Sequence, residues 1–259
     1  MKTESPQGQT FHRFFDSWLD ELHTNLEQLV SAASRHHDDE HIQDNSSVLS
    51  PLIEKAMGHY EQYYKAKSDG AKGDVISMFS PTWLTKLEDS LLWIAGWRPT
   101  TAVHLLYSKS GIQLEDRLSD LVPTLTVGDL GDLTSNQINQ IDEIQRKTIR
   151  EERMVSEKMA KLQESAADTP MVNLSNEESE KIRKGNDDGG RNGDREVDKV
   201  LESKKDELEE VLHMADDLRM ETLRSVVEVL TPMQAVYFLI AAAELHLRLH
   251  EWGKKRDAI

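Results

Sequence analysis

The sequence contains no cysteine among its 259 residues. This absence excludes disulfide bonds, thiolate metal sites and a cysteine nucleophile. It is the composition expected of a protein that does not depend on an oxidising compartment. Basic residues are few relative to acidic ones, 31 against 47, so the formal net charge is −16. Such a charge repels phosphate backbones and anionic membranes, and we therefore expect no direct binding to nucleic acid or to a membrane.

Long apolar runs and strand-like patterns are missing as well. No apolar stretch approaches the roughly 18 residues that span a bilayer, and the opening MKTESPQGQTFHRFF lacks the apolar region of a secretory signal. No alternating stretch predicts a strand, no glycine-rich phosphate loop is present, and there is no nucleophile elbow. We therefore expect a protein without enzymatic activity, located in the nucleus and cytoplasm.

The pattern that is present is helical. Over residues 11–33, apolar side chains recur every three or four positions, as on one face of a helix. Capping signals predict later helix starts. Serine precedes proline at Ser50 and Ser80, and threonine precedes a glutamine by three residues at Thr134 and Thr231. The predicted helices cover 11–33, 51–67, 81–96, 101–111, 112–122, 135–167, 197–230 and a final segment from 232.

One internal segment has a different composition. Residues 170–196, PMVNLSNEESEKIRKGNDDGGRNGDRE, contain almost no large apolar side chains and cluster Gly, Asn and Asp. Such a segment cannot bury enough surface to offset its ordering entropy, so we expect a mobile, disordered insertion before the last two helices. The sequence therefore predicts a single-domain, all-α multi-helix bundle with long helices, with a flexible N-terminus over 1–10 and the helical domain over 11–257.

Two histidines in the final helix, His246 and His250, lie four residues apart and so share one of its faces. On a helical projection they fall between two apolar sectors, which predicts packed surroundings or a cleft. Burial favours the neutral imidazole that ligates metals. Zinc would need a further ligand, and H-L-R-L-H lacks the inner glutamate of the H-E-x-x-H metalloproteases. Two interpretations stay open: ligands of a metal or haem iron, or packing residues with satisfied hydrogen bonds.

Three segments, at 80–111, 166–170 and 245–257, resemble the plant Delay of Germination (DOG) domain, and the resemblance runs from Phe11 to Asp257. Its most specific motifs are the turn W-I-A-G-W-R-P and the terminal H-x3-H-E-W-G. The same domain forms the C-terminal part of plant TGA-type bZIP transcription factors. No basic region precedes Phe11, and the histidine pair is typical of the dormancy branch, so the chain is similar to that branch.

The resemblance implies a regulator of seed dormancy and abscisic-acid responses that acts by binding other proteins. In the dormancy branch a D-S-Y-L-E-W segment is linked to recognition of type 2C protein phosphatases, and F-D-S-W-L-D-E-L at 15–22 is similar. The implied partner-binding residues are Asp16, Ser17, Trp18, Leu19 and Asp20. Glu21 stands where the family segment has a second aromatic residue. The alternative places Trp18 in the core, because the apolar stripe runs through it.

The dormancy branch also associates haem binding with its terminal histidines, which correspond here to His246 and His250. The resemblance therefore implies haem as the cofactor, with its iron as the only metal. Two other functions stay open beside phosphatase binding. One is a transcription-associated adaptor that self-associates, as in TGA factors, and the other is a helical carrier of a small molecule or lipid.

Overall fold

The structure is a computed structural model that describes residues 6–38, 46–119, 130–183 and 191–258. These residues form an all-α bundle, as predicted, and contain no β-strand apart from an isolated bridge between Trp93 and Gly96. None of the described helices combines the length and apolarity needed to cross a membrane. The helices are α1 (Pro6–Asp38), α2 (Ser46–Phe79), α3 (Lys86–Ser90), α4 (Thr100–Ser119), α5 (Ser135–Glu164), α6 (Thr169–Arg183), α7 (Arg191–Val229) and α8 (Pro232–Asp257), with short 3-10 turns at Leu130–Asp132 and Ser165–Ala167.

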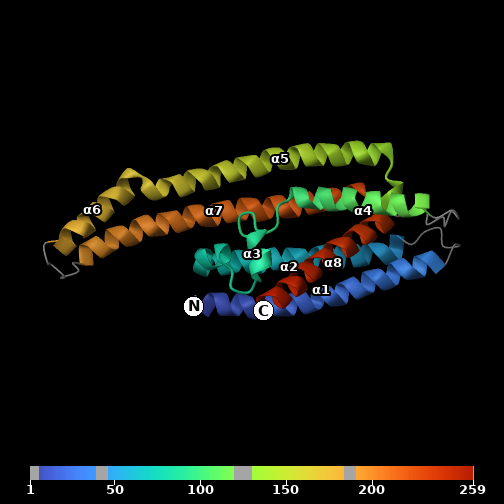
Figure 1. Cartoon of the computed structure of the whole chain (residues 1–259), viewed down its shortest axis with the longest axis horizontal. Helices are drawn as coiled ribbons and strands as arrows, with labels where there is room; N and C mark the ends of the chain where they lie inside the picture. Colours follow the sequence, from blue (N-terminus) through green and yellow to red (C-terminus); the bar gives the residue numbers. More distant parts are fainter. Residues whose placement is uncertain (1–5, 39–45, 120–129, 184–190, 259) are drawn as a thin grey trace.

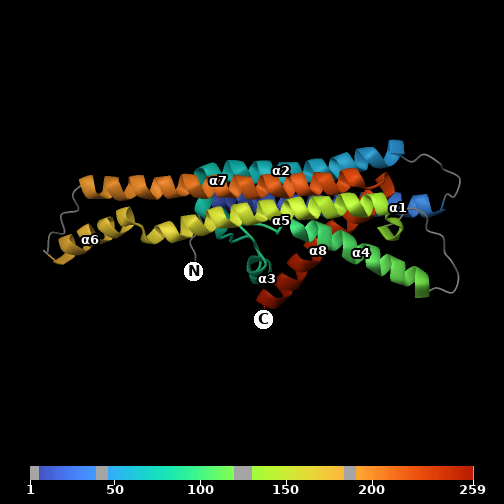
Figure 2. The same ribbon diagram turned by 90° about the horizontal axis from the view of Figure 1, so that it is seen from above.

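Two antiparallel helix pairs build the bundle (Figure 1). Helices α1 and α2 form one pair and α5 and α7 the other, with α2 packed against α7. Helix α8 crosses α1 and α2 obliquely, and α6 with the first part of α7 extends beyond the other helices (Figure 2). The crossing brings the C-terminal histidine region onto α1, α2 and α3.

The apolar stripe of α1 forms one of the buried clusters. Phe11, Phe15, Trp18 and Leu22 are all buried, and they pack with side chains of α2, of the segment before α3 and of α8. A larger cluster joins α2, α4, α7 and α8. The helical periodicity predicted over residues 11–33 is thus confirmed, and its buried face is the one that the spacing indicated.

Two of the four predicted helix starts are confirmed. Thr134 and Thr231 each cap a helix, with the side chain of Gln137 or Gln234 returning to the backbone of the capping residue. The start predicted at Ser50 is wrong, because α2 already begins at Ser46. A proline near the beginning of a helix disturbs few hydrogen bonds, so it does not require the helix to begin there.

The start predicted at Ser80 is also wrong. Residues 81–85 are not helical, and α3 begins only after Thr85, whose capping box with Glu88 is complete. In the capping box the two side chains accept hydrogen bonds from two backbone N–H groups that have no partner within the helix. Serine followed by proline provides one such acceptor, and the proline lacks an N–H group. The two short helices predicted over 101–111 and 112–122 are a single helix, α4, through Ser119, and residues 120–122 lie outside the described part.

The predicted insertion at 170–196 contains helix where the structure describes it. Helix α6 covers residues 170–183 and α7 begins at Arg191, so the expectation of a disordered segment is wrong for these parts. The side chain of Asp168 accepts a hydrogen bond from Met171 N, and Lys204 of α7 pairs with Asp168, which together fix the first turn of α6. Residues 6–10, part of the N-terminus that was predicted to be flexible, are helical; residues 1–5 and 184–190 lie outside the described part.

Candidate functional site

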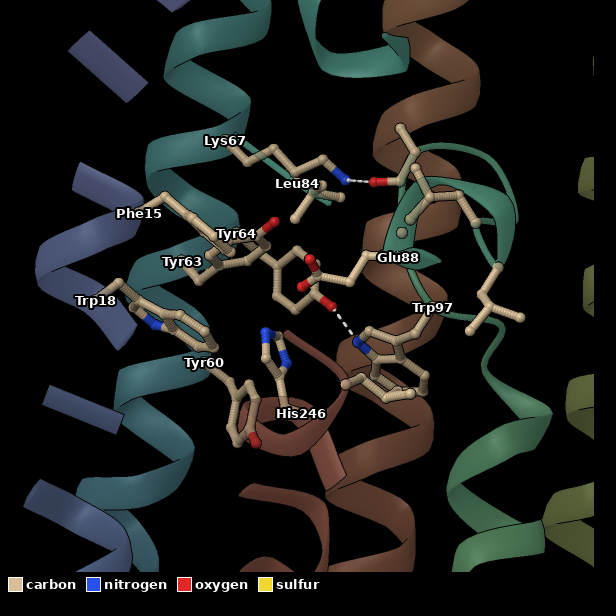
Figure 3. A pocket seen from close by; sticks show the side chains of 15 residues that line it. Phe15, Trp18, Tyr60, Tyr63, Tyr64, Lys67, Leu84, Glu88, Trp97 and His246 are labelled. Carbon is tan, nitrogen blue, oxygen red and sulfur yellow. Dashed lines mark hydrogen bonds between the residues drawn. The ribbon is translucent and has the colours of Figure 1, made fainter. Parts of the chain in front are cut away.

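An aromatic cavity of about 140 Å³ lies where α8 crosses α1 and α2 (Figure 3). Helix α1 contributes two rings and α2 contributes three tyrosines, while α3, the turn after it and α8 complete the walls. The aromatic and polar residues that line it are Phe15, Trp18, Tyr60, Tyr63, Tyr64, Lys67, Glu88, Trp97 and His246. A concave, mostly apolar space with a few convergent polar groups is the usual form of a small-molecule site.

Trp18 reaches this cavity from the core. Trp18 is only 3% exposed. Its ring stacks on the ring of His59 with centroids 4.8 Å apart, and its Nε1 donates to the His59 carbonyl oxygen at 3.1 Å. Leu19 is 8% exposed. The structure therefore places two of the five predicted partner-binding residues inside, and the core alternative for Trp18 holds. The other three, Asp16, Ser17 and Asp20, are exposed on the outer face of α1.

The two C-terminal histidines have different environments. His250 is buried, and its Nδ1 lies 3.0 and 3.1 Å from the two carboxylate oxygens of Glu88. The same carboxylate accepts hydrogen bonds from the backbone and hydroxyl of Thr85. His246 points toward Glu88 between Trp18 and Trp97 (Figure 3). Its Nε2 is enclosed and has no hydrogen-bond partner, and the same is true of His250 Nε2.

Burial and hydrogen bonds shift the protonation of this group. Desolvation lowers the pKa of His246 to about 4, against a smaller upward effect of the nearby Glu88 carboxylate. Desolvation raises the pKa of Glu88, but hydrogen bonds from His250 and Thr85 outweigh it, and the net pKa is lowered. Near neutral pH the cavity therefore contains a neutral imidazole beside a charged carboxylate.

The turn at residues 93–99 forms the wall opposite α1, and it is held by charged side chains. Ile94 and Ala95 adopt left-handed backbone angles, with φ of 45° and 56°, which is a costly conformation for residues other than glycine. Lys67 Nζ donates to Ala95 O at 2.7 Å, and Arg219 donates to Trp97 O at 2.7 Å and to Ile94 O at 2.9 Å. These charge-assisted hydrogen bonds compensate the strained turn.

Helix α5 holds the end of the same turn. The buried carboxylate of Glu152 accepts from Arg98 Nε and from Thr100 N, both at 2.7 Å. Thr100 is the first residue of α4, so Glu152 supplies the negative charge that a helix N-terminus favours. Within the cavity, Trp97 Nε1 donates to Tyr64 Oη at 2.7 Å. The W-I-A-G-W-R-P motif is thus a clamped turn that presents one aromatic ring to the cavity.

The family model described as DOG1, seed dormancy control, matches residues 23–108. Protein DOG1-like 3 of Arabidopsis thaliana is 32% identical over 216 residues, which is 81% of this chain and 73% of that protein. The chain belongs to the DOG1 family. Another Arabidopsis relative, Protein RESPONSE TO ABA AND SALT 1, is 30% identical over 253 residues, 96% of this chain and 97% of that protein.

The chain is also similar to a transcription factor. Transcription factor TGA2.3 of Oryza sativa subsp. japonica is 28% identical over 257 residues, which is 96% of this chain and 66% of that protein. The resemblance to the DOG domain, and to its copy in TGA factors, is therefore confirmed. The two motifs on which this resemblance depends are W-I-A-G-W-R-P and H-x3-H-E-W-G. In the structure they are the clamped turn and the end of α8 that lines the cavity.

Haem, which the dormancy-branch resemblance implies, fits this site in donor chemistry but not in space. The Nε2 atoms of His246 and His250 are enclosed and unpartnered, as an iron ligand requires. The cavity of about 140 Å³ is close to the roughly 150 Å³ engineered cavity that takes up benzene, and a porphyrin is far larger than benzene. A porphyrin does not fit inside this conformation, and haem binding stays a prediction.

Several residues of the site were missed at the level of sequence. Thr85 and Glu88 form a T-x-x-E capping box that the sequence displays, but Ser80 and Pro81 carry a competing start signal a few residues earlier. The pairing of Glu88 with His250 joins residues 162 positions apart. No local pattern indicates that contact, or the buried Lys67 that faces Asp216 on another helix.

The low pKa of His246 predicts a pH-dependent stability. The unfolded histidine, with a pKa of 6.5, binds a proton that the folded one, at about 4, does not. Unfolding thus takes up a proton between these values, so the stabilisation is complete above pH 6.5 and is lost as pH falls through 4. The difference is on the order of 3 kcal/mol. Urea denaturation at several pH values should show a smaller loss on acidification in His246→Leu than in the wild type.

The exposed His23 on α1 provides the matched control for this measurement. His23→Leu removes a histidine without touching the cavity, and we expect it to retain the wild-type pH dependence. Equal acid sensitivity of His246→Leu and the wild type would show that His246 is not the group responsible.

Proposed function

We propose that this protein is a non-enzymatic regulator in seed dormancy and abscisic-acid responses that binds and restrains a type 2C protein phosphatase. Membership of the seed-dormancy family supports the biological setting, and so does the similarity to a relative named for its response to abscisic acid and salt. The phosphatase is inferred from the D-S-W-L segment of α1. The proposed location is the nucleus and cytoplasm.

The surface offered to the phosphatase is the outer face of α1. Asp16, Ser17 and Asp20 are exposed there, within two turns of one helix. Trp18 and Leu19 are buried behind them and fix the rotation of α1 about its axis, so their role in this proposal is to position the polar face. Acidic groups at the rim of an interface steer association and select partners by charge, and we expect the phosphatase to present basic residues here.

Charge reversal on this face tests the proposal. Asp16→Lys combined with Asp20→Lys should weaken binding to purified plant type 2C phosphatases at least about 10-fold, since it replaces attraction with repulsion. The matched control is Asp198→Lys with Glu202→Lys, which makes the same charge change at the same spacing on an exposed part of α7. Affinities are measured by titration calorimetry or surface plasmon resonance.

Two results would contradict the phosphatase proposal. One is failure of the intact wild-type chain to associate with any member of a broad type 2C panel. The other is an equal loss of affinity in the α1 and α7 double variants, because a general charge effect would then replace a specific surface.

A second candidate is an adaptor that dimerises and binds transcription-associated proteins. The match to TGA2.3 over 96% of this chain favours it. So do large exposed apolar side chains on α8 and beside α3, because Leu245 is 44%, Trp252 50% and Leu91 58% exposed. Light scattering of the purified chain separates the two candidates, since a stable dimer at micromolar concentration supports the adaptor.

A further inference from the structure

The aromatic cavity contains an unused hydrogen-bonding atom, His246 Nε2. Among the described residues that line the cavity, His246 Nε2 is the one buried side-chain nitrogen or oxygen that lacks a hydrogen-bond partner. Its neighbours are engaged: Tyr64 with Trp97, Lys67 with Ala95 and Asp216, and Glu88 with Thr85 and His250. Leaving a buried polar atom unpaired is unfavourable, so a ligand that pairs with it gains the net free energy of one hydrogen bond.

The size and lining of the cavity limit the ligand to one aromatic ring. The volume of about 140 Å³ matches the space that benzene occupies in an engineered protein cavity. Trp18 lies 5.2 Å from His246 and 5.0 Å from Tyr63, measured between ring centroids, so these rings are already at the distances of aromatic packing. A flat ring that enters among them makes the same kind of contact.

The charges around the cavity select against an anionic ligand. Glu88 presents a carboxylate whose net pKa is lowered, so it is negative at neutral pH. Lys67, the cation of the lining, is bound to Asp216 at 2.9 Å. A carboxylate ligand would thus be repelled by the Glu88 carboxylate. Lys67 could not compensate, because it already pairs with Asp216, and burial of an unpaired charge is strongly unfavourable.

We propose that the cavity binds a neutral, single-ring phenol whose hydroxyl group hydrogen-bonds to His246 Nε2 and whose ring packs among Trp18, Tyr63 and Trp97. A hydroxyl group both donates and accepts, so it pairs with Nε2 in either tautomer of the neutral imidazole. A purely apolar ring fills the same space but leaves Nε2 unpaired. The site is independent of the phosphatase-binding face, since it lies on the inner side of α1.

The test compares three probes of similar size on the full chain. Phenol, toluene and benzoate are titrated separately, and binding is followed by saturation-transfer NMR and by the change in unfolding temperature. We expect phenol to bind roughly 3- to 10-fold more tightly than toluene, the equivalent of one hydrogen bond, and benzoate not to bind. No saturation transfer to phenol at millimolar concentration, or tighter binding of benzoate than of phenol, would overturn the proposal.

Variants assign the binding to His246 and to the cavity. In His246→Leu the preference for phenol over toluene should disappear while both still bind, and His246→Gln should restore part of it. Leu249→Trp, which places an indole in the cavity from α8, should exclude all three probes. Circular dichroism verifies that each variant is folded. A phenol preference that survives in His246→Leu, or phenol binding that survives in Leu249→Trp, contradicts the assignment.

Discussion

Replacing Arg219 with methionine should lower the free energy of unfolding by about 3–5 kcal/mol. The guanidinium group is fully buried, pairs with Asp216, and donates to the carbonyl oxygens of Trp93, Ile94 and Trp97. Methionine keeps an unbranched apolar stem but is shorter and has no donor, so it leaves the buried Asp216 carboxylate partly uncompensated and removes the side-chain donor from all three carbonyl groups, of which Trp93 O retains the backbone hydrogen bond from Gly96 N. The left-handed turn at 94–95 then loses the contacts that hold it. Urea denaturation at neutral pH measures the effect.

The exposed Arg224 supplies the control for this substitution. It lies five residues further along α7 and pairs with Glu61 at 2.7 Å, but its side chain is 52% exposed. Exposed ion pairs contribute at most about 1 kcal/mol, so Arg224→Met should fall within that limit. If Arg219→Met proved as mild as Arg224→Met, the clamp on the 93–99 turn would not stabilise the fold.

The second large effect is expected from Gly253→Ala in α8. A Cβ atom at this position would lie 2.0 Å from Thr85 Oγ1 and 2.5 Å from Thr85 Cβ, so either α8 or the beginning of α3 has to move. Overpacking of a tight contact costs about 1–3 kcal/mol, and loss of the Thr85 cap adds roughly 1 kcal/mol. We expect a total of about 2–4 kcal/mol in thermal or urea unfolding, together with weaker binding of phenol because the displaced Glu88 lines the cavity.

Gly111→Ala is the matched comparison. Gly111 lies on an exposed position of α4, and nothing lies within 4 Å of the Cβ that alanine would add. Alanine is favoured over glycine inside a helix by about 0.5–1 kcal/mol, so this variant should be more stable than the wild type. Opposite signs for the same chemical change would identify the contact between α8 and α3 as the cause, and two stabilising results would rule it out.

The sequence predicted those parts of the fold that local physics determines. The caps at Thr134 and Thr231 depend on residues three positions away, and the stripe of α1 depends on a period that the sequence displays. The same stripe already indicated that Trp18 is core. The composition of residues 170–183 does not indicate helix α6, because its first turn depends on other residues: Asp168 caps it, and Lys204 of α7 fixes that cap.

The site itself could be predicted only in part. The spacing of His246 and His250 drew attention to α8, and the enclosed Nε2 atoms confirm the packed surroundings that the helical projection indicated. The cavity depends on contacts between distant segments. Lys67 and Asp216 are separated by 149 positions, and Trp97 and Tyr64 by 33. Such pairs follow from the way the helices cross, and local patterns in a single sequence do not reveal that crossing.

The alternation along α1 affects how its variants behave. Two consecutive turns of this helix carry the buried Phe15 and Trp18 on one side and the exposed Asp16 and Asp20 on the other. Truncating Trp18 would let the helix rotate or shift, and its acidic groups would move with it. Partner binding would then be weakened although the indole makes no contact with the partner. Only substitutions at the solvent-facing positions therefore report direct contact.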